Sequence, residues 1–284
     1  MGQMSNANWI THPTANLNDY GVYYFRNTVT INSLPKSLNV LISADTRYKL
    51  YVNGTYVTFG PARSDIKHWK YDSINIYPYL KIGENSIAVQ VYNFGKDKPV
   101  AQLSSKTAFI FKGSAGLEDV MNTGKGNWKV IKDNAWQATK LEWWDWANGW
   151  YAIGCTDSLG AEQSIWGWQE NGFDHSSWSD AKILPNVDCE WVLEVRDIPL
   201  MHEKITRFNS IRRISGITGS DNFIKGTGTL SIPANKTMSM ILDHDMLTMG
   251  FPVIKTSKGK NSVIKITYAE SPFTNYAEKG GKKV

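Results

Sequence analysis

The sequence has few cysteines and no long apolar run, and both absences exclude classes of protein. Its two cysteines, Cys155 and Cys189, are too few for a disulfide scaffold and lack the spacing of metal ligands. Two alternatives stay open for them: one bridge formed in an oxidising compartment, or two buried free thiols. No apolar run approaches the roughly 18 residues that cross a bilayer, so no membrane partner is expected.

The chain also lacks a large excess of positive or negative charge. Lys and Arg number 31 against 26 Asp and Glu, which gives a formal net charge of +5. The longest basic cluster, Lys279–Lys283, contains two glycines and is typical of a solvated tail. Nucleic-acid binding needs a clustered basic footprint, so we expect no nucleic-acid partner.

Motifs of common catalytic and cofactor sites are missing. There is no Gly-x-Ser-x-Gly elbow, no phosphate-binding loop and no zinc spacing. Asp243-His244-Asp245 does not predict a metal site, because alternate residues of a strand point to opposite faces. Acidic residues such as Glu142, Asp145 and Glu270 form no recognisable pair of the kind that glycoside hydrolysis needs. We therefore predict no catalytic residue, metal ligand or cofactor in this chain; nothing in the sequence supports a calcium requirement.

The sequence is rich in the alternation typical of β-strands. Apolar residues alternate with others in 40–44, 48–52 and 87–91, and this period of two predicts strands with one buried face. Asn53-Gly54 predicts a two-residue hairpin, because both turn positions need a positive φ. Helical signals are few: a turn or two within 117–122, and a short stripe of apolar residues over 141–151 that Gly149 and the many aromatic residues disfavour. Many short strands with frequent turns predict an all-β protein built as a β-sandwich or jelly roll.

Composition divides the chain into four segments. Residues 1–7 have no apolar stretch and are interpreted as an expression leader rather than a signal peptide. A first β-domain is expected over 8–198 and a connector over 199–207. Because the chain ends soon after a strand with no closing element, we expect a fragment of a longer protein. A second, partial β-sandwich is expected over 208–284, with strands near 228–232, 238–243, 253–256 and 263–268.

Short stretches spread along nearly the whole chain match the sequence patterns of one protein family. They include Ile42-Ser-Ala-Asp-Thr-Arg-Tyr-Lys-Leu-Tyr-Val-Asn-Gly54, Gly60-Pro-Ala-Arg-Ser-Asp65 and His68-Trp-Lys-Tyr-Asp72. Gly172-Phe-Asp-His-Ser-Ser-Trp178 is a weaker element, with His175 where the pattern has Asp. Together they resemble the N-terminal domain of bacterial α-L-rhamnosidases of glycoside hydrolase family 78, and Ile266-Thr-Tyr-Ala-Glu270 resembles the β-sandwich that follows it.

The resemblance implies a fold and a function. The fold is a galactose-binding-like jelly-roll β-sandwich followed by a second, partial β-sandwich, with the catalytic (α/α)6 barrel further along the natural polypeptide. The whole enzyme would hydrolyse terminal α-L-rhamnose from plant glycans or glycosides, with inversion, in the periplasm or after secretion. The expected partners are a rhamnose-containing glycan and the catalytic barrel of the same polypeptide. Two alternatives are an autonomous carbohydrate-binding module and a structural or adhesin-like sandwich that contacts protein.

Tryptophan is concentrated in one stretch that could bind sugar. Eight of the 12 tryptophans lie between Trp143 and Trp191, and several fall in Glu142-Trp-Trp-Asp-Trp-Ala-Asn-Gly-Trp-Tyr151. Indole rings can stack on the C–H face of a sugar while carboxylates and amides bind its hydroxyls. The same rings could equally pack in the sandwich or against the catalytic barrel. The candidate carbohydrate-binding residues here are Trp143, Trp144, Trp146 and Trp150.

The loop of residues 60–69 is the second candidate site, because binding residues concentrate on loops between strands. The alternative is a network that anchors the loop, with an Arg63–Asp65 ion pair and a half-buried tryptophan. Its candidate carbohydrate-binding residues are Arg63, Asp65, His68 and Trp69.

Overall fold

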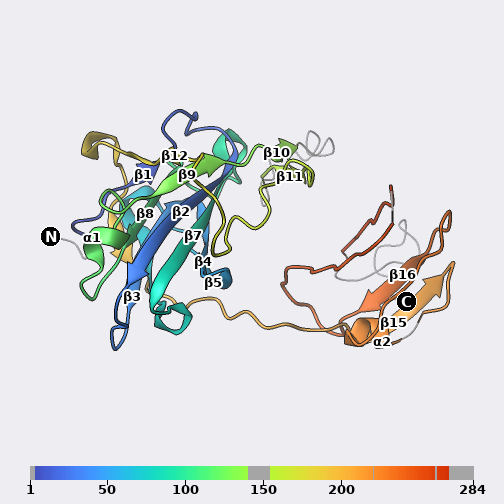
Figure 1. The fold of residues 1–284 in the computed structure, drawn as a ribbon. Coiled ribbons are helices and arrows are strands. Elements are labelled where there is room, and N and C mark those ends of the chain that lie inside the picture. The colour runs from blue at the N-terminus through green and yellow to red at the C-terminus, as the bar shows by residue number, and fades with distance from the viewer. Residues whose placement is uncertain (1–3, 140–153, 220, 260, 269–284) are drawn as a thin grey trace. The chain divides into compact units, whose positions relative to one another are not determined.

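The computed structural model describes residues 4–139, 154–219, 221–259 and 261–268. The chain divides into two compact units, Met1–Leu200 and Met201–Val284 (Figure 1). In the first unit the helical elements are η1 (Ile66–His68), η2 (Tyr77–Tyr79), η3 (Gly95–Asp97), α1 (Glu118–Met121) and η5 (Asn186–Asp188). Its strands are β1 (Ile10–Thr11), β2 (Gly21–Ile31), β3 (Asn39–Asp45), β4 (Arg47–Val52), β5 (Thr55–Gly60), β6 (Trp69–Asn75), β7 (Gly83–Asn93), β8 (Ala108–Lys112), β9 (Lys129–Lys132), β10 (Trp136–Thr139), β11 (Thr156–Leu159), β12 (Ser179–Asp180), β13 (Lys182–Ile183) and β14 (Leu193–Val195).

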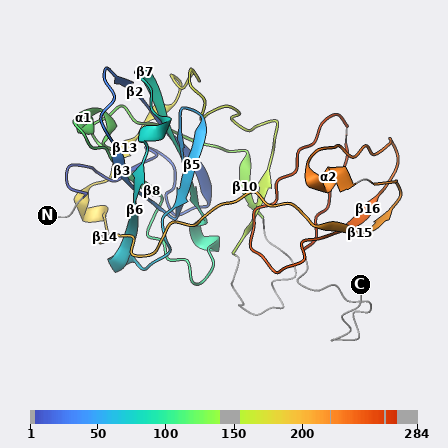
Figure 2. The same ribbon diagram turned by 90° about the horizontal axis from the view of Figure 1, so that it is seen from below.

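Two six-stranded sheets form the first unit, in the orders β13-β1-β8-β3-β6-β14 and β12-β9-β2-β7-β4-β5. Strand pairs are antiparallel except β14, which runs parallel to β6 at the sheet edge (Figure 2). The alternating residues predicted to face inward do so: Val40, Ile42 and Ala44 have no exposed surface and belong to the main core cluster. The all-β class and the sandwich are confirmed.

Both outer faces of the sandwich are covered as well. On β2, Tyr23 and Phe25 face the main core, while the alternate residues Val22 and Tyr24 are buried beneath Trp168 and Trp178. Trp168 stacks on Tyr24 with the ring centroids 4.1 Å apart. A strand covered on both faces can be buried along most of its length, so the usual alternation with polar residues is lost.

The other sheet is covered by a second aromatic cluster. Trp9 and Trp191 lie with ring centroids 4.4 Å apart, and Trp69 and Tyr71 of β6 pack in the same cluster. The residues from about 165 to 195 therefore fold back over both faces of the sandwich. Large aromatic side chains suit this role because each removes a large apolar area from water.

The predicted hairpin is confirmed. Asn53 has φ +52° and Gly54 φ +78°, and Val52 pairs with Thr55 across the turn. Asn53 also fixes its surroundings: its side chain donates to the carbonyl of Tyr79 and accepts from the backbone N–H of Ser86. The short helix expected within 117–122 is α1.

The second unit contains β15 (Ser210–Ser215), α2 (Asp221–Lys225) and β16 (Ser239–Asp243), with β15 and β16 paired antiparallel. The strand expected near 238–243 is confirmed as β16. Those expected near 228–232, 253–256 and 263–268 are wrong: the described residues there pair with no neighbouring strand. Their apolar residues stay exposed, with Val253 at 82% and Val263 at 92%. Apolar alternation alone does not make a strand, because the backbone groups also need partners.

Two further features bear on the sequence predictions. Cys155 and Cys189 are both free and partly buried, which agrees with the thiol alternative. Among the described helices, none has the length and apolar character to cross a membrane.

Candidate functional site

The four tryptophans Trp143, Trp144, Trp146 and Trp150 lie outside the described residues. The strands on either side of them are well defined. Thr139 at the end of β10 pairs with Thr156 at the start of β11, so the two ends of the intervening segment are held together. Their assignment as carbohydrate-binding residues stays a prediction.

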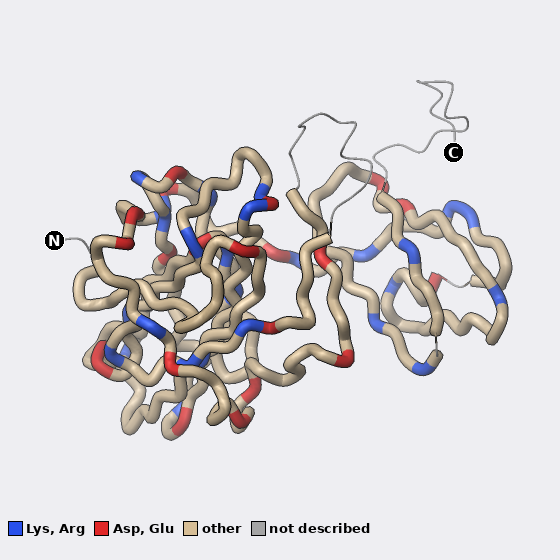
Figure 3. The backbone as a smooth tube through the Cα atoms, turned by 90° about the horizontal axis from the view of Figure 1, so that it is seen from above, with Lys and Arg blue, Asp and Glu red and all other residues tan. Residues whose placement is uncertain are grey.

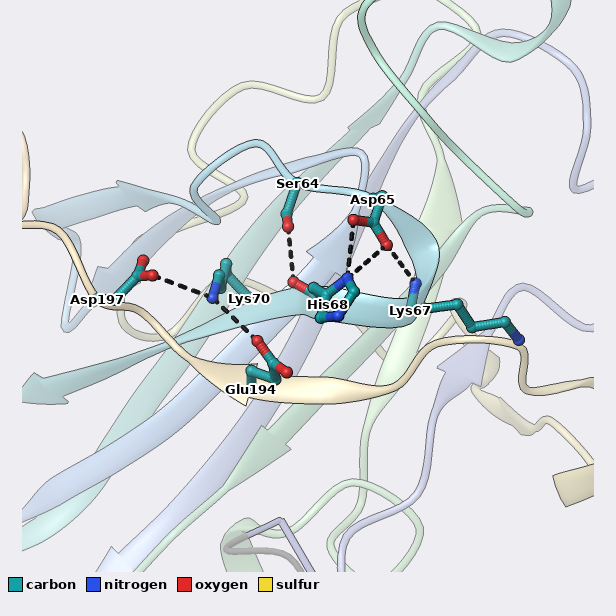
Figure 4. Close-up of polar contacts among 7 residues, drawn as sticks. All are labelled: Ser64, Asp65, Lys67, His68, Lys70, Glu194 and Asp197. Atoms are coloured by element: carbon teal, nitrogen blue, oxygen red, sulfur yellow. Dashed lines mark hydrogen bonds and ion pairs between the residues drawn. The ribbon is translucent and has the colours of Figure 1, made fainter.

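The loop of residues 60–69 is held by its own polar side chains (Figure 4). Asp65 caps η1, because its carboxylate accepts the backbone N–H of Lys67 at 2.8 Å. The same carboxylate lies 2.9 Å from Nδ1 of His68. The Ser64 hydroxyl donates to the carbonyl of His68 at 2.7 Å, which closes the turn. An aspartate at a helix N-cap is favoured for this reason.

The edge strand β14 anchors this loop to the sheet. Trp69 N–H donates to the carbonyl of Val192, and Val192 N–H donates to the carbonyl of Ile66. Beside them, Lys70 Nζ lies 3.1 Å from a carboxylate oxygen of Glu194 and 3.4 Å from one of Asp197 (Figure 4). The loop and the edge strand thus form one polar surface patch, in which Ser64 and Lys70 are half-buried. We call it the loop patch: Ser64, Asp65, Lys67, His68, Lys70, Glu194 and Asp197.

The two ionisable side chains at the centre of the loop patch favour each other's charged form. The hydrogen bond to His68 lowers the pKa of the Asp65 carboxyl, and the hydrogen bond to Asp65 raises the pKa of the His68 imidazole. Both remain open to solvent, with 52% of the Asp65 side chain and 59% of the His68 side chain exposed. Water and salt screen such a pair, so it orients the loop more than it stabilises the fold.

Trp69 is not available to a sugar, contrary to its selection as a binding residue. It is 2% exposed and packs in the cluster with Trp9 and Trp191. The half-buried tryptophan of the alternative interpretation is also wrong, because the burial is complete.

The expected Arg63–Asp65 ion pair does not form. Asp65 pairs with His68 instead, and Arg63 is exposed. Burial first, and then the positive charge of Arg63, lower the pKa of Arg47 to about 10. Of the four candidate residues of this loop, Arg63, Asp65 and His68 are therefore the ones that a solute can reach.

A second polar group lies beside the ends of the tryptophan segment and was missed in the sequence. The hydroxyls of Tyr20 and Tyr92 both donate to one carboxylate oxygen of Asp157 on β11, at 2.7 and 3.0 Å. No spacing rule could have found it, because the three residues come from distant parts of the chain. Phe94 packs edge-on against Tyr92 with ring centroids 4.7 Å apart.

The chemistry available in these two places is hydrogen bonding to hydroxyl groups. Carboxylates, an imidazole and phenols can all bind a polyol. Strong electrostatic catalysis needs a site that excludes water, and the Asp65–His68 pair lies on an open surface. Within the described ranges, no three or more His, Cys, Asp or Glu side chains are grouped so as to hold a metal ion, and Asp243 pairs with Arg212.

Fold and surface together define a β-sandwich domain with solvent-exposed polar loops. Comparison with known proteins gives its family. The family model for the α-L-rhamnosidase N-terminal domain matches residues 34–202. The chain belongs to this family.

Relatives agree with the match. An α-L-rhamnosidase of Streptomyces avermitilis is 25% identical over 186 residues, which cover 63% of this chain and 14% of that enzyme. The structure of a family 78 rhamnosidase of Bacillus sp. GL1 superposes with a TM-score of 0.62 at 23% identity, covering 80% of this chain and 24% of that one. The α-L-rhamnosidase of Dictyoglumus thermophilum gives a TM-score of 0.51 at 18% identity, over 72% of this chain and 24% of that one. The chain thus spans between about a seventh and a quarter of these relatives.

Proposed function

We propose that the protein to which these residues belong hydrolyses terminal α-L-rhamnose from plant glycans or glycosides. The residues described here would support its catalytic domain without cleaving the sugar themselves. The observation that carries the proposal is the family match over 34–202, together with relatives that are named α-L-rhamnosidases and are several times longer.

The accessory role is supported by the architecture of the chain. Glycoside hydrolysis needs one carboxyl group that protonates the leaving oxygen and a second that activates water or attacks the sugar. Many aromatic side chains of the first unit cover its two sheets, and Asp65 and His68 of the loop patch bond to each other on an open surface. The two α-helices in the described parts of the chain have four and five residues, too few to build a helical barrel.

A second proposal is that the chain binds carbohydrate in its own right. The exposed groups of Arg63, Asp65 and His68 favour it, as does the carboxylate of Asp157 held by two phenols. Calorimetric titration with L-rhamnose and with rhamnose-capped oligosaccharides tests it. Heat that saturates at millimolar sugar supports binding, and its absence leaves only the supporting role.

We also propose that the natural protein acts in the periplasm or outside the cell, because polymeric plant glycans do not cross membranes unaided. Fractionation of the natural host, followed by immunodetection of this domain, tests the proposal. Detection in the cytosolic fraction alone contradicts it.

The activity itself is tested on the complete gene product. We expect the full-length protein to release 4-nitrophenol from 4-nitrophenyl α-L-rhamnopyranoside, and not from the matching β-D-glucoside or α-D-galactoside. A folded full-length protein that cleaves one of the other two glycosides and not the rhamnoside contradicts the proposal.

A further inference from the structure

A depression of about 320 Å³ lies at the opposite edge of the sheet from the loop patch. The loop patch lies beside β6 and β14, whereas the depression is formed around β1 and β13. Three chain segments line it: residues 11–17, Lys106, and the stretch from Lys182 to Asp188. Its volume is at the lower end of the range of about 300–1,000 Å³ that is usual for small-ligand pockets.

The walls of the depression are fixed by the sheet. Thr11 pairs with Lys182 across the β1–β13 ladder, and its hydroxyl donates to the carbonyl of Thr107 at 2.8 Å. Leu184 N–H donates to the carbonyl of Trp9 at 2.8 Å. Because the backbone of its walls is bonded in place, binding would require the ordering of side chains but not of the backbone.

Positive charge predominates in the lining. Lys106 and Lys182 contribute two ammonium groups against the single carboxylate of Asp188. Neither ammonium has an ion-pair or hydrogen-bond partner among the residues that the structure describes, whereas Lys70 and Lys129 each pair with a carboxylate. Charges of both signs are otherwise scattered over the first unit (Figure 3).

His12 in the same lining is held as a neutral hydrogen-bond donor. Its Nδ1 accepts the backbone N–H groups of Thr14 and Ala15 at 3.3 and 3.1 Å, so the ring proton is on Nε2. Burial, and then the charge of Lys132, lower the pKa of this imidazole. Because Nδ1 is the acceptor, the Nε2–H group of His12 is the donor that a ligand could use.

The rest of the lining is mixed, with the threonines Thr11 and Thr14 beside several apolar side chains. Leu184 is buried, and Leu17, Ala15 and Pro185 lie beside it. An apolar surface suits the C–H face of a sugar ring, and two ammonium groups suit a carboxylate.

We propose that this depression binds an acidic sugar residue, with the carboxylate of a uronic acid between Lys106 and Lys182 and with His12 donating to a ring hydroxyl. The inference rests on the proposed function in one respect, that the ligand is a saccharide. It assigns to the N-terminal domain a second contact with the glycan, separate from the rhamnose that the complete enzyme would cleave.

The test uses the 284-residue chain and calorimetric titration with sodium D-glucuronate, with D-glucose as the neutral match and inorganic phosphate as the small-anion match. We expect glucuronate to bind and glucose not to bind. Lys106→Gln and Lys182→Gln should each weaken binding by about fivefold, and the double variant by roughly 20-fold, as expected for partly exposed ion pairs. Lys36→Gln, at an exposed lysine outside the depression, is the matched control and should change nothing.

Three outcomes overturn the proposal: glucuronate binds no better than glucose, phosphate competes for the same site with equal affinity, or the double variant binds as well as the unchanged chain. Thermal unfolding of each variant shows that it is folded. If the full-length protein cleaves the aryl rhamnoside while glucuronate fails to bind, only this inference is lost. If glucuronate binds while the rhamnoside is not cleaved, the proposed uronic-acid site is supported and the proposed enzymatic activity is contradicted.

Discussion

Replacing Arg26 by methionine should destabilise the first unit substantially. Arg26 lies on β2 and is 1% exposed. Its guanidinium donates to the carbonyls of Trp168 and Glu170 at 2.9 and 2.7 Å and to Nδ1 of His175 at 3.3 Å. These three contacts fasten the segment that covers the outer face of the sheet.

The loss in the free energy of unfolding depends on the hydrogen bonds that are removed and on the carbonyl groups that stay buried without a donor. Hydrogen bonds to a charged donor contribute about 1.5–3 kcal/mol each, but removing a buried guanidinium also relieves its desolvation cost. The Trp168 carbonyl would stay buried without its donor, which costs about 1–3 kcal/mol. We expect a net loss of about 3 kcal/mol in the free energy of unfolding. For a unit of this size that corresponds to a fall of about 6–12 °C in the unfolding midpoint.

Differential scanning calorimetry measures the midpoint, and near-ultraviolet circular dichroism reports the stacking of Trp168 on Tyr24. Arg26→Lys keeps the positive charge but not the planar set of N–H donors of the guanidinium, so its loss in the free energy of unfolding should lie between those of the unchanged chain and Arg26→Met. Arg63→Met removes an exposed arginine and is the matched control. If Arg26→Met unfolds at the temperature of the control, the guanidinium does not fasten this segment and the reasoning is wrong.

Three further predictions concern His175, the Asp65–His68 pair and the turn at Gly54. His175→Asp should raise the unfolding midpoint by a few degrees, because a carboxylate in place of Nδ1 gives the buried Arg26 guanidinium an ion-pair partner of opposite charge. In an NMR titration His68 should show a pKa above its ordinary 6.5, and Asp65→Asn should bring it back, because Asp65 is the main cause of the shift. Gly54→Ala should cost about 1 kcal/mol, since alanine disfavours the positive φ of this turn.

Each of these has a result that contradicts it. A lower midpoint for His175→Asp would mean that desolvation of the carboxylate outweighs the new pair. An unchanged His68 titration in Asp65→Asn would show that the two side chains do not interact in solution. Because the pKa of His68 is raised in the folded chain, the stabilisation from its pairing should be present at pH below 6.5 and be lost as the pH rises through the raised value. Gly83→Ala, at a second glycine with a positive φ but with no atom within 4 Å of an added Cβ, should cost about as much as Gly54→Ala; a cost at Gly54 alone would contradict the φ explanation and point to the contact with Glu170.

The sandwich could be predicted because its inner strands follow the period of two. Val40, Ile42 and Ala44 show it clearly, and the Asn53-Gly54 turn fixes where one hairpin reverses. The second unit was predicted less well. β16 was expected, but β15 was missed, and the apolar residues of 228–232, 253–256 and 263–268 pair with no strand among the described residues. Strand formation depends on a neighbouring backbone that local sequence does not specify.

The candidate site was only partly predictable. The loop position was indicated by its place between strands. The Asp65–His68 contact was not predicted: it replaces the expected Arg63–Asp65 pair, because η1 brings the residue three positions along the chain to the Asp65 carboxylate. The burial of Trp69 could not be predicted, because Trp9 and Trp191, which cover it, come from the two ends of the first unit. The contacts of Arg26 depend on distant residues in the same way.

Whether these residues support a catalytic domain without cleaving sugar is decided by the activity of the 284-residue chain by itself on 4-nitrophenyl α-L-rhamnopyranoside, measured beside the full-length gene product. We expect nitrophenol release by the full-length protein and none above the buffer rate by the 284 residues alone. Turnover by the purified chain, abolished by substitution of one of its own carboxylates, would contradict it.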